Sequence, residues 1–271
     1  MGENIKKLSI TLLLSLILFG CTSNPIFSLI PDPTATTTNV TGVSGHLKYG
    51  IPSTNGTCLT RTGYVLLHDS TKKEPLWVSY DLTASHLSGP ATRTDNYKAD
   101  PALPVGQRAE LSDYSGSGYD RGHMCPAADN YYSITAMNEC FYLSNMCPQN
   151  GSINSGKWAS LESQIRTFTA TKGECWIICG PIFSGTISTI GSNQVAVPSS
   201  FYKIVVYASG SGVEAAGFVM PNASSSNALS SYLTKIDDIE ALTGLDFLNA
   251  LSVSDQALIE GSIPSNTEVL R

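Results

Sequence analysis

The densest group of residues able to do chemistry is the tetrapeptide Asp120-Arg121-Gly122-His123. An imidazole with an ordinary pKa of about 6.5 is largely uncharged at neutral pH and can accept a proton from water. The guanidinium beside it can form a forked contact with phosphate oxygens and stabilise negative charge on them. Gly122 is expected to let the backbone turn sharply or approach a ligand. Because a loop histidine is more often solvated or capping, the tetrapeptide alone indicates phosphodiester hydrolysis only weakly.

A second group lies downstream, where apolar spacing predicts a helix over 153–169 that ends before Gly173. At about 100° per residue, Asn154 and Glu162 are about 80° apart and share one face, while Trp158 anchors the helix to the core. An amide oxygen and a carboxylate are hard ligands that suit Mg²⁺. The alternative is that Asn154 caps the helix and Glu162 is simply solvated. The apolar positions are Ile153, Trp158, Leu161, Ile165 and Phe168.

The elements around these groups predict a single α+β domain. Residues 64–68 and 76–80 are rich in β-formers and flank a polar link, which indicates a hairpin. Residues 88–120 are rich in Gly, Ser, Pro and Asp and are expected to form a long functional loop. Leucine and isoleucine at helical spacing predict a second helix over 229–242, closed by Gly244. Further strands are expected at 139–145, 175–179, 201–207 and 214–220.

The N-terminus is typical of an exported chain. Lys6 and Lys7 precede an apolar run, 8–19, that is too short to span a bilayer and resembles a signal-peptide core. Leu18-Phe19-Gly20-Cys21 resembles a bacterial lipobox, so residues 1–21 are predicted to be a signal peptide ending in a lipid-bearing Cys21. Ordinary secretory cleavage is the alternative. Residues 22–41, rich in Pro and Thr, predict a tether, and the domain is placed at 42–271. The expected location is the cell envelope or outside the cell, with membrane contact through lipid on Cys21.

Six cysteines remain in the exported part, where an oxidising compartment favours disulfides. Their pairing is not determined by sequence, except that Cys175 and Cys179, about 13 Å apart on a strand, are too distant to join each other. A zinc site is less favoured, because no Cys-x-x-Cys pair exists. The six are Cys58, Cys125, Cys140, Cys147, Cys175 and Cys179.

The charge balance separates two functional classes. The formal net charge is −6, and cleavage before Cys21, which removes Glu3, Lys6 and Lys7, leaves −7. A passive nucleic-acid binder normally carries a basic surface, so this composition argues against one. It permits an enzyme whose metal ion and few arginines meet a phosphate locally.

The ordered motifs together resemble the DNA/RNA non-specific endonucleases with a ββα-metal (His-Me finger) active site, the family of mitochondrial endonuclease G. The resemblance covers about Tyr49 to Phe247 and implies a central, mainly antiparallel sheet flanked by helices, with a ββα-metal motif. Cys125 and Cys147 depart from the pattern and suggest local disulfides. The matching segments are Asp120–Met124, Pro126, Asp129, Leu143–Met146, Pro148-Gln149, Asn154, Trp158, Leu161, Glu162, Gly180–Phe183, Val197-Pro198, Phe201–Lys203 and Gly217–Asn222.

The resemblance implies a role for each site residue. His123 matches the general base that activates water, and Asn154 the sole direct protein ligand of one Mg²⁺, for which Mn²⁺ or another divalent ion can substitute. Glu162 matches a carboxylate that orients metal-bound water. Arg121 and Arg93 match arginines that contact and stabilise the phosphate. The implied activity is Mg²⁺-dependent cleavage of DNA and RNA, with little sequence preference and 5′-phosphate ends.

Other functions remain open at this level. The chain could be a surface lipoprotein with a catalytically inactive nuclease fold that binds nucleic acid or another macromolecule. The intact set of His123, Asn154 and Glu162 argues against this loss of activity. A nuclease restricted to one structured substrate is a third possibility. Cys125, two residues from His123, suggests a thiol nucleophile, but an exported cysteine is more often in a disulfide. Ser144 and the other serines near His123 lack the Gly-x-Ser-x-Gly turn of serine hydrolases.

Overall fold

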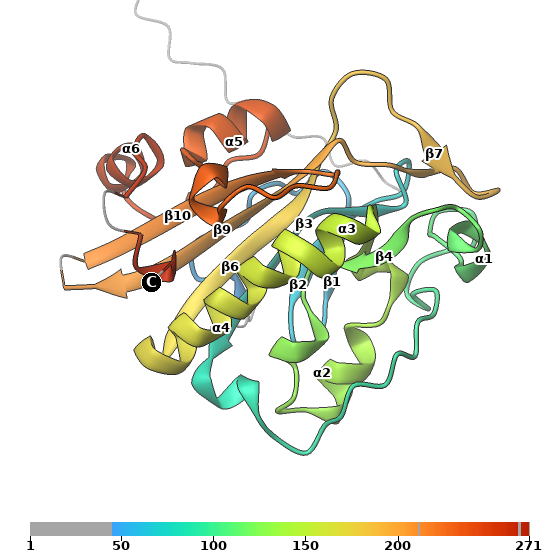
Figure 1. Ribbon diagram of the computed structural model, residues 1–271, viewed down its shortest axis with the longest axis horizontal. Helices are drawn as coiled ribbons and strands as arrows, with labels where there is room; N and C mark the ends of the chain where they lie inside the picture. Colours follow the sequence, from blue (N-terminus) through green and yellow to red (C-terminus); the bar gives the residue numbers. More distant parts are fainter. Residues whose placement is uncertain (1–44, 211, 265–266, 271) are drawn as a thin grey trace, which may run out of the picture. The chain divides into compact units, whose positions relative to one another are not determined.

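The computed structural model describes residues 45–210, 212–264 and 267–270 (Figure 1). The predicted signal peptide, its Cys21 and the tether at 22–41 lie outside these residues. Among the helices that the structure describes, none is long and apolar enough to cross a membrane.

A seven-stranded sheet organises the described residues, and every neighbouring pair of its strands is antiparallel. The predicted hairpin is confirmed as β2 and β3, with Val65 opposite Ser79. The strands expected at 175–179, 201–207 and 214–220 are confirmed within β6, β9 and β10. In spatial order the strands are β1 (Thr57–Thr60), β2 (Val65–Asp69), β3 (Glu74–Thr83), β6 (Glu174–Ile182), β9 (Ser200–Ser209), β10 (Gly212–Pro221) and β11 (Leu233–Thr234).

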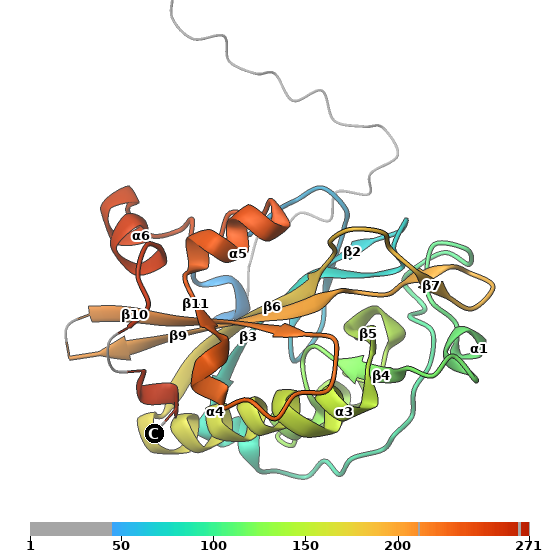
Figure 2. The ribbon, with the colours of Figure 1, turned by 45° about the horizontal axis from the view of Figure 1, so that its top comes forward.

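Helices cover both faces of this sheet. Figure 2 shows α4 (Ala159–Lys172) on one side of β6 and β9, and α5 (Ile236–Thr243) and α6 (Val253–Glu260) on the other. Alternate residues of β6 enter different cores: Ile177 packs in the core that contains α4, and Ile178 in the core that contains α5. Burial on both faces explains why the strands read as continuous apolar runs rather than alternating ones.

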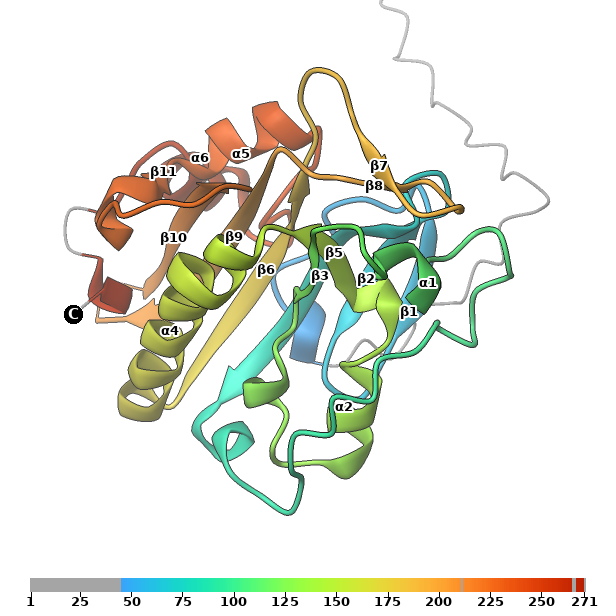
Figure 3. The ribbon, with the colours of Figure 1, turned by 45° about the vertical axis from the view of Figure 1, so that its right-hand side comes forward.

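A small two-stranded sheet lies beside the α4 face and leads into the helix (Figure 3). Its strands are β4 and β5, and the chain passes from β5 through α3 and one π-helical turn into α4. The elements outside the main sheet are β4 (Asp120–His123), β5 (Met146–Gln149), β7 (Thr189–Ile190), β8 (Val195–Ala196), α1 (Leu111–Tyr114), α2 (Ile134–Glu139), α3 (Gly151–Ile153) and the π turn (Asn154–Trp158).

The strand expected at 139–145 is wrong. Glu139 ends α2, and Leu143–Asn145 form a 3₁₀ turn before β5 begins at Met146. The main chain forms local turns here. The Tyr142 N–H donates to the Glu139 carbonyl at 3.0 Å, and the Asn145 N–H donates to the Tyr142 carbonyl at 2.9 Å. Apolar side chains of this segment are buried by local turns, which an apolar run alone does not distinguish from a strand.

The helix expected at 229–242 is half right. Residues 229–232 form a 3₁₀ turn, and β11 then pairs with the edge of β10, with Leu233 opposite Phe218. Only α5 continues as a helix, and it ends as expected at Gly244, whose φ of 70° is left-handed. The main chain of residues 233–234 forms hydrogen bonds with the open edge of β10. These bonds favour a strand there, although the spacing of the apolar residues is typical of a helix.

The predicted disulfides are not formed among the buried cysteines that the structure describes. Cys125, Cys140, Cys147, Cys175 and Cys179 are free thiols inside the α4-side core. Burial raises the pKa of Cys140 and Cys175 to about 12 and that of Cys179 to about 11, so these groups stay protonated. They therefore act as small apolar side chains, and a buried, protonated Cys125 is unsuited to be a nucleophile.

Candidate active site

The tetrapeptide singled out in the sequence is strand β4 rather than part of a loop. It pairs with β5, with Asp120 opposite Gln149 and His123 opposite Met146. Gly122 does not make a turn; a Cβ there would lie 2.1 Å from Gln149 Oε1. Glycine is needed because the Gln149 side chain fills the space that a Cβ would occupy.

The helix after β5 begins with a widened turn that carries Asn154. Asn150 caps α3 by accepting a hydrogen bond from the Ser152 N–H, and the π turn follows before α4. Gly156 interrupts the helical backbone with φ −101° and ψ −110°. Single π turns inside helices are frequent at functional sites. The predicted helix is thus confirmed, except that Asn154 begins a π turn rather than lying in a regular α-helix. Gly173 ends α4.

Two hydrogen bonds fix the helix against β4. The Asn154 side-chain amide donates to Asp120 Oδ2 at 2.9 Å, and Trp158 Nε1 donates to the His123 carbonyl at 3.3 Å. Trp158 is 1% exposed, which confirms its expected role as an anchor in the core. These contacts hold Asn154 and His123 on neighbouring elements in one defined arrangement.

The His123 ring lies in an aromatic and cationic setting. Phe141 meets it edge-on at 5.0 Å between ring centroids, and Tyr97 does so at 5.6 Å. Its Nε2 is buried without a hydrogen-bond partner. Burial and the charges of Arg93 and Arg121 lower the pKa of His123 from 6.5 to about 3. The imidazole is therefore neutral at physiological pH and keeps a nitrogen lone pair for a proton.

Both arginines are held beside this ring by Tyr97. The guanidinium of Arg121 lies 4.3 Å from the Tyr97 ring centroid. Arg93 donates to the Tyr97 hydroxyl at 3.3 Å and lies 5.4 Å from the Phe141 ring centroid. The structure thus brings Arg93, from the loop before β4, beside Arg121 and His123 of β4.

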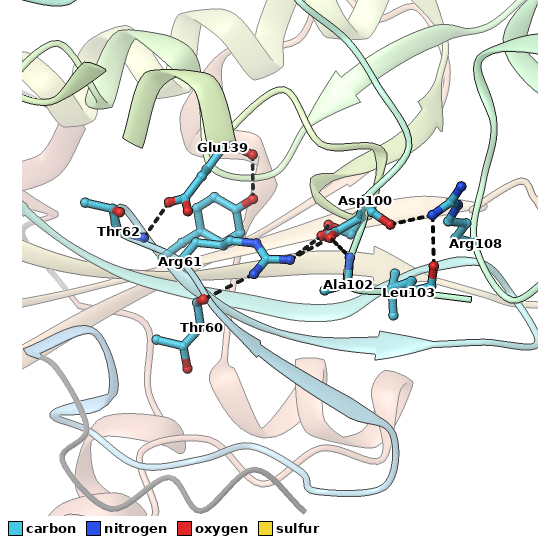
Figure 4. Close-up of polar contacts among 10 residues, drawn as sticks. Thr60, Arg61, Thr62, Asp100, Ala102, Leu103, Arg108 and Glu139 are labelled. Atoms are coloured by element: carbon cyan, nitrogen blue, oxygen red, sulfur yellow. Dashed lines mark hydrogen bonds and ion pairs between the residues drawn. The ribbon is translucent and has the colours of Figure 1, made fainter. Parts of the chain in front are cut away.

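An ionic network ties down the loop that carries Arg93 and Tyr97 (Figure 4). Asp100 is fully buried, and both of its oxygens accept hydrogen bonds from Arg61 at 2.6 Å. Ser144 also donates to it at 2.6 Å, and Arg108 donates to the Asp100 carbonyl at 2.9 Å. A buried carboxylate with this many donors is strongly held. The expected long loop at 88–120 is therefore ordered where it passes the site.

We expect Tyr97→Ala to lower kcat/KM about 10-fold, because both arginines lose the surface that orients them. Tyr97→Phe keeps the ring and loses only the hydroxyl, so its kcat/KM should stay close to that of the wild type. Steady-state rates on plasmid DNA check this. An equal loss in the two variants would assign the effect to the hydroxyl rather than to stacking.

Glu162 lies further along the helix, beside a buried lysine. Lys203, on β9, is 0% exposed, and its Nζ lies 3.8 Å from Glu162 Oε1 and 4.4 Å from the Trp158 ring centroid. Burial raises the pKa of Glu162 from 4.5 to about 7, although Lys203 opposes the shift. The carboxyl group therefore titrates near neutral pH, as suits proton transfer or water orientation.

A second ion pair flanks Glu162. Arg166, one helical turn beyond Glu162, donates to the buried Asp129 at 3.1 Å, and the Tyr80 hydroxyl donates to Asp129 at 3.2 Å. Arg166 also lowers the pKa of Glu162, against the effect of burial. The charged neighbours of Glu162 are thus Lys203, Arg166 and Asp129, whereas those of His123 are the two arginines.

The pH dependence of cleavage should follow Glu162 rather than His123. His123 is neutral above pH 3, so an acidic limb with a midpoint of about 7 belongs to ionisation of Glu162. Lys203→Met removes the cation that lowers this pKa, and the limb should move to higher pH by about one unit or more. The pH profile of kcat/KM measures it, with the exposed Lys235→Met as control. An unmoved limb in Lys203→Met would exclude Glu162 as its source.

The residues suit a hard divalent ion. Only the amide nitrogen of Asn154 can donate to Asp120, so its Oδ1 is left as a free acceptor. An amide oxygen beside a carboxylate suits Mg²⁺, which keeps most of its waters. Asn154 would hold the ion and Asp120 would orient the amide. Grouped His, Cys, Asp or Glu ligands within the described residues occur elsewhere, at Asp237, Glu240 and Glu260, and include no cysteine.

A polar cleft of about 540 Å³ opens next to Asp120 and Arg121. Residues of α1 and of the segment after it form its other walls. A chain of phosphates could continue into this cleft from Arg121. The lining residues are Leu111, Ser112, Tyr114, Ser115, Tyr119, Asp120 and Arg121.

Three contributors were not assigned roles from sequence. Asp120 lies within the motif but received no role, and Tyr97 lies within the loop predicted at 88–120 without being singled out. Lys203 was a matched residue of the resemblance without a role; its position in an apolar strand, where an unpaired charge is costly, is the signal that could have singled it out.

Comparisons with known proteins agree with this geometry. The profile of the DNA/RNA non-specific endonucleases matches residues 42–254. Nuclease C1 of Cunninghamella echinulata var. echinulata is 36% identical, over 77% of this chain and 89% of its own. A nuclease of Nostoc sp. is 33% identical, over 95% of this chain and 97% of its own. The crystal structure of an EndoG/EndoGI complex superposes with a TM-score of 0.73, at 31% identity, over 77% of this chain and 91% of that one.

The chain therefore belongs to the DNA/RNA non-specific endonuclease family. It is a nuclease, a phosphodiester hydrolase of a metal-dependent family. The predicted α+β fold, with a large antiparallel sheet and flanking helices, is confirmed.

Proposed function

We propose that the protein is a Mg²⁺-dependent endonuclease that cuts DNA and RNA with little sequence preference, with His123 as general base. The observation that carries this proposal is the neutral His123 ring, whose buried Nε2 has no partner and whose pKa is lowered by burial and by the nearby charges of Arg93 and Arg121. A base that is uncharged and flanked by cations suits attack on a negatively charged phosphodiester.

The chain's own residues would divide the work as follows. His123 takes a proton from a water that lies in line with the scissile bond. Arg121 and Arg93 stabilise the added negative charge; Arg93 is 48% exposed, and a phosphate can replace its weak pair with Asp95. Asn154 would hold the divalent ion, which would supply Lewis-acid stabilisation of the leaving oxygen. Glu162 would orient a water that protonates the leaving 3′ oxygen, and the products would carry 5′-phosphate ends.

A phosphate also alters the basicity of His123. The two guanidinium charges lower its pKa in the free enzyme, and a bound phosphate offsets them. The imidazole therefore becomes a stronger base when substrate is present. Because these contacts address phosphate and not base edges, they carry no direct sequence information.

The experiment is digestion of supercoiled plasmid and of a mixed-sequence RNA with Mg²⁺, with Mn²⁺ and with EDTA. We expect cleavage of both polymers, loss of activity in EDTA, and products that ligate without added kinase. Full activity in EDTA would remove the metal from the mechanism. If no metal ion supports cleavage, a catalytically inactive protein that binds nucleic acid would be favoured. Cleavage of only one of the two polymers would indicate a nuclease restricted to one structured substrate.

We further propose export and lipid attachment, on the sequence of residues 1–21 alone. The full chain expressed in a bacterium should incorporate labelled palmitate and fractionate with membranes, whereas Cys21→Ala should lose the label. Release of an unlabelled wild-type protein into the medium or periplasm would instead support ordinary secretory cleavage. Absence of any processing would contradict export.

A further inference from the structure

Three carboxylates meet where α5 and α6 approach each other. One oxygen from each of Asp237, Glu240 and Glu260 lies within 4.8 Å of the others. Asp237 is in the first turn of α5, Glu240 follows one turn later, and Glu260 is the last residue of α6. The cluster thus joins two helices that are separate in the sequence.

Glu260 is unusually placed for a carboxylate. It is only 5% exposed, and its Oε1 is buried without a hydrogen-bond partner. The C-terminus of a helix carries partial negative charge and disfavours an anion. Burial raises the pKa of Glu260 to about 7, and the like charges of Glu240 and Asp237 add to the shift. Within the described part of the chain, no hydrogen bond reaches Oε1 of Glu260 to offset this cost when the group is ionised.

The three carboxylates have no paired cation among the residues that the structure describes. Among the ion pairs of the described residues, none includes Asp237, Glu240 or Glu260. The charged groups that act on Glu260 are all acidic: Glu240, Asp237 and Asp246. Glu240 uses one oxygen to accept the Phe247 N–H at 2.7 Å, which fixes its side chain. A fixed carboxylate, a buried unpaired one and an exposed third carboxylate form a partly enclosed set of oxygen ligands.

We propose that Asp237, Glu240 and Glu260 bind a divalent cation, with Ca²⁺ as the best fit, which joins α6 to α5. Ca²⁺ accepts several carboxylate oxygens in irregular geometry and completes its coordination with water. Asp237 is exposed, so water can reach the site. Mg²⁺ demands near-octahedral geometry and is the less suitable ion.

This site is separate from the catalytic one. Ile236 and Ile239 of α5 pack in the core on the sheet face opposite α4, and Figure 2 shows α5 and α6 across the sheet from α4. Loss of the cation should therefore lower stability without abolishing cleavage. The proposal does not depend on the proposed nuclease mechanism.

Thermal unfolding of the mature protein with EDTA, 10 mM Mg²⁺ or 10 mM Ca²⁺ tests the site. For a dissociation constant in the range of extracellular Ca²⁺ modules, 10 mM Ca²⁺ should raise Tm by about 4–7 °C. Asn154→Ala should retain this rise, which separates it from the catalytic ion. Asp237→Asn and Glu260→Gln should lose it, while Asp238→Asn, a control on the same turn, should keep it.

The same variants show the charge effect directly. In EDTA, Glu260→Gln should unfold at a higher temperature than the wild type, because it removes a buried, unpaired carboxylate. In Ca²⁺ the wild type should unfold at the same temperature as Glu260→Gln or at a higher one. If Ca²⁺ leaves the wild-type Tm unchanged, and Tm instead rises as pH falls through 7, Glu260 shares a proton and the proposal is wrong. An equal Ca²⁺ response in Asp237→Asn and Asp238→Asn would also overturn it.

Discussion

His123→Ala should reduce kcat on plasmid DNA by about 10²- to 10⁴-fold, the usual contribution of a positioned general base. The imidazole has no structural hydrogen bond from Nε2 to lose, and its main-chain carbonyl still accepts from Trp158. The fold should therefore survive the change, with a modest loss of stability from the space left beside Phe141. Circular dichroism and Tm separate these two effects.

Two controls make this result specific to base catalysis. His86→Ala removes a half-buried histidine that stacks on Tyr132, outside the site, and should leave kcat unchanged. Added imidazole can enter the space vacated in His123→Ala and should restore part of its activity, without stimulating the wild type. Undiminished cleavage by His123→Ala would contradict the assignment, and absence of rescue alone would point to a positioning role.

Local sequence patterns predicted an element correctly where the apolar spacing of a segment and its main-chain hydrogen bonds favoured the same secondary structure. The β2–β3 hairpin and the ending of α4 at Gly173 are of this kind, because both are decided by residues close in sequence. Residues 229–234 failed for the opposite reason. Their apolar residues do have helical spacing. Residues 233–234 nevertheless pair with the open edge of β10, and a local sequence pattern does not predict pairing with another strand.

The site could be predicted in part for the same reason. The β4 tetrapeptide and the helix with Asn154 and Glu162 are two short segments whose residue types already indicate chemistry. The environment of each residue could not be predicted, because it comes from distant contacts. Lys203 on β9 adjusts the pKa of Glu162, and burial with Arg93 and Arg121 lowers that of His123. Sequence indicated a histidine of ordinary pKa, and the structure contains one that is neutral over the whole physiological range.

Asn154 is the other residue whose loss should be severe, and the reason lies in its contact with Asp120. That hydrogen bond leaves Oδ1 as the one side-chain atom of Asn154 that can bind a cation. Asn154→Ala removes it, and kcat/KM should fall by at least about 10²-fold, since a metal ion contributes several kcal/mol of transition-state stabilisation. The Mg²⁺ concentration for half-maximal rate should also rise. Ser155→Ala, at the exposed neighbouring position, serves as the matched control.

Asp120→Asn distinguishes a ligand from a positioning residue. An asparagine at 120 can still accept from Asn154 but no longer attracts its amide by charge, so the orientation of Oδ1 becomes less certain. We expect the Mg²⁺ concentration for half-maximal rate to rise by about 10- to 100-fold, as for other residues that orient a metal ligand. The effect on kcat at saturating Mg²⁺ should be smaller. If Asn154→Ala behaved the same way, with kcat recovered at high Mg²⁺, Asn154 would only position water near the ion. A loss that no Mg²⁺ concentration restores is the result expected of a direct ligand.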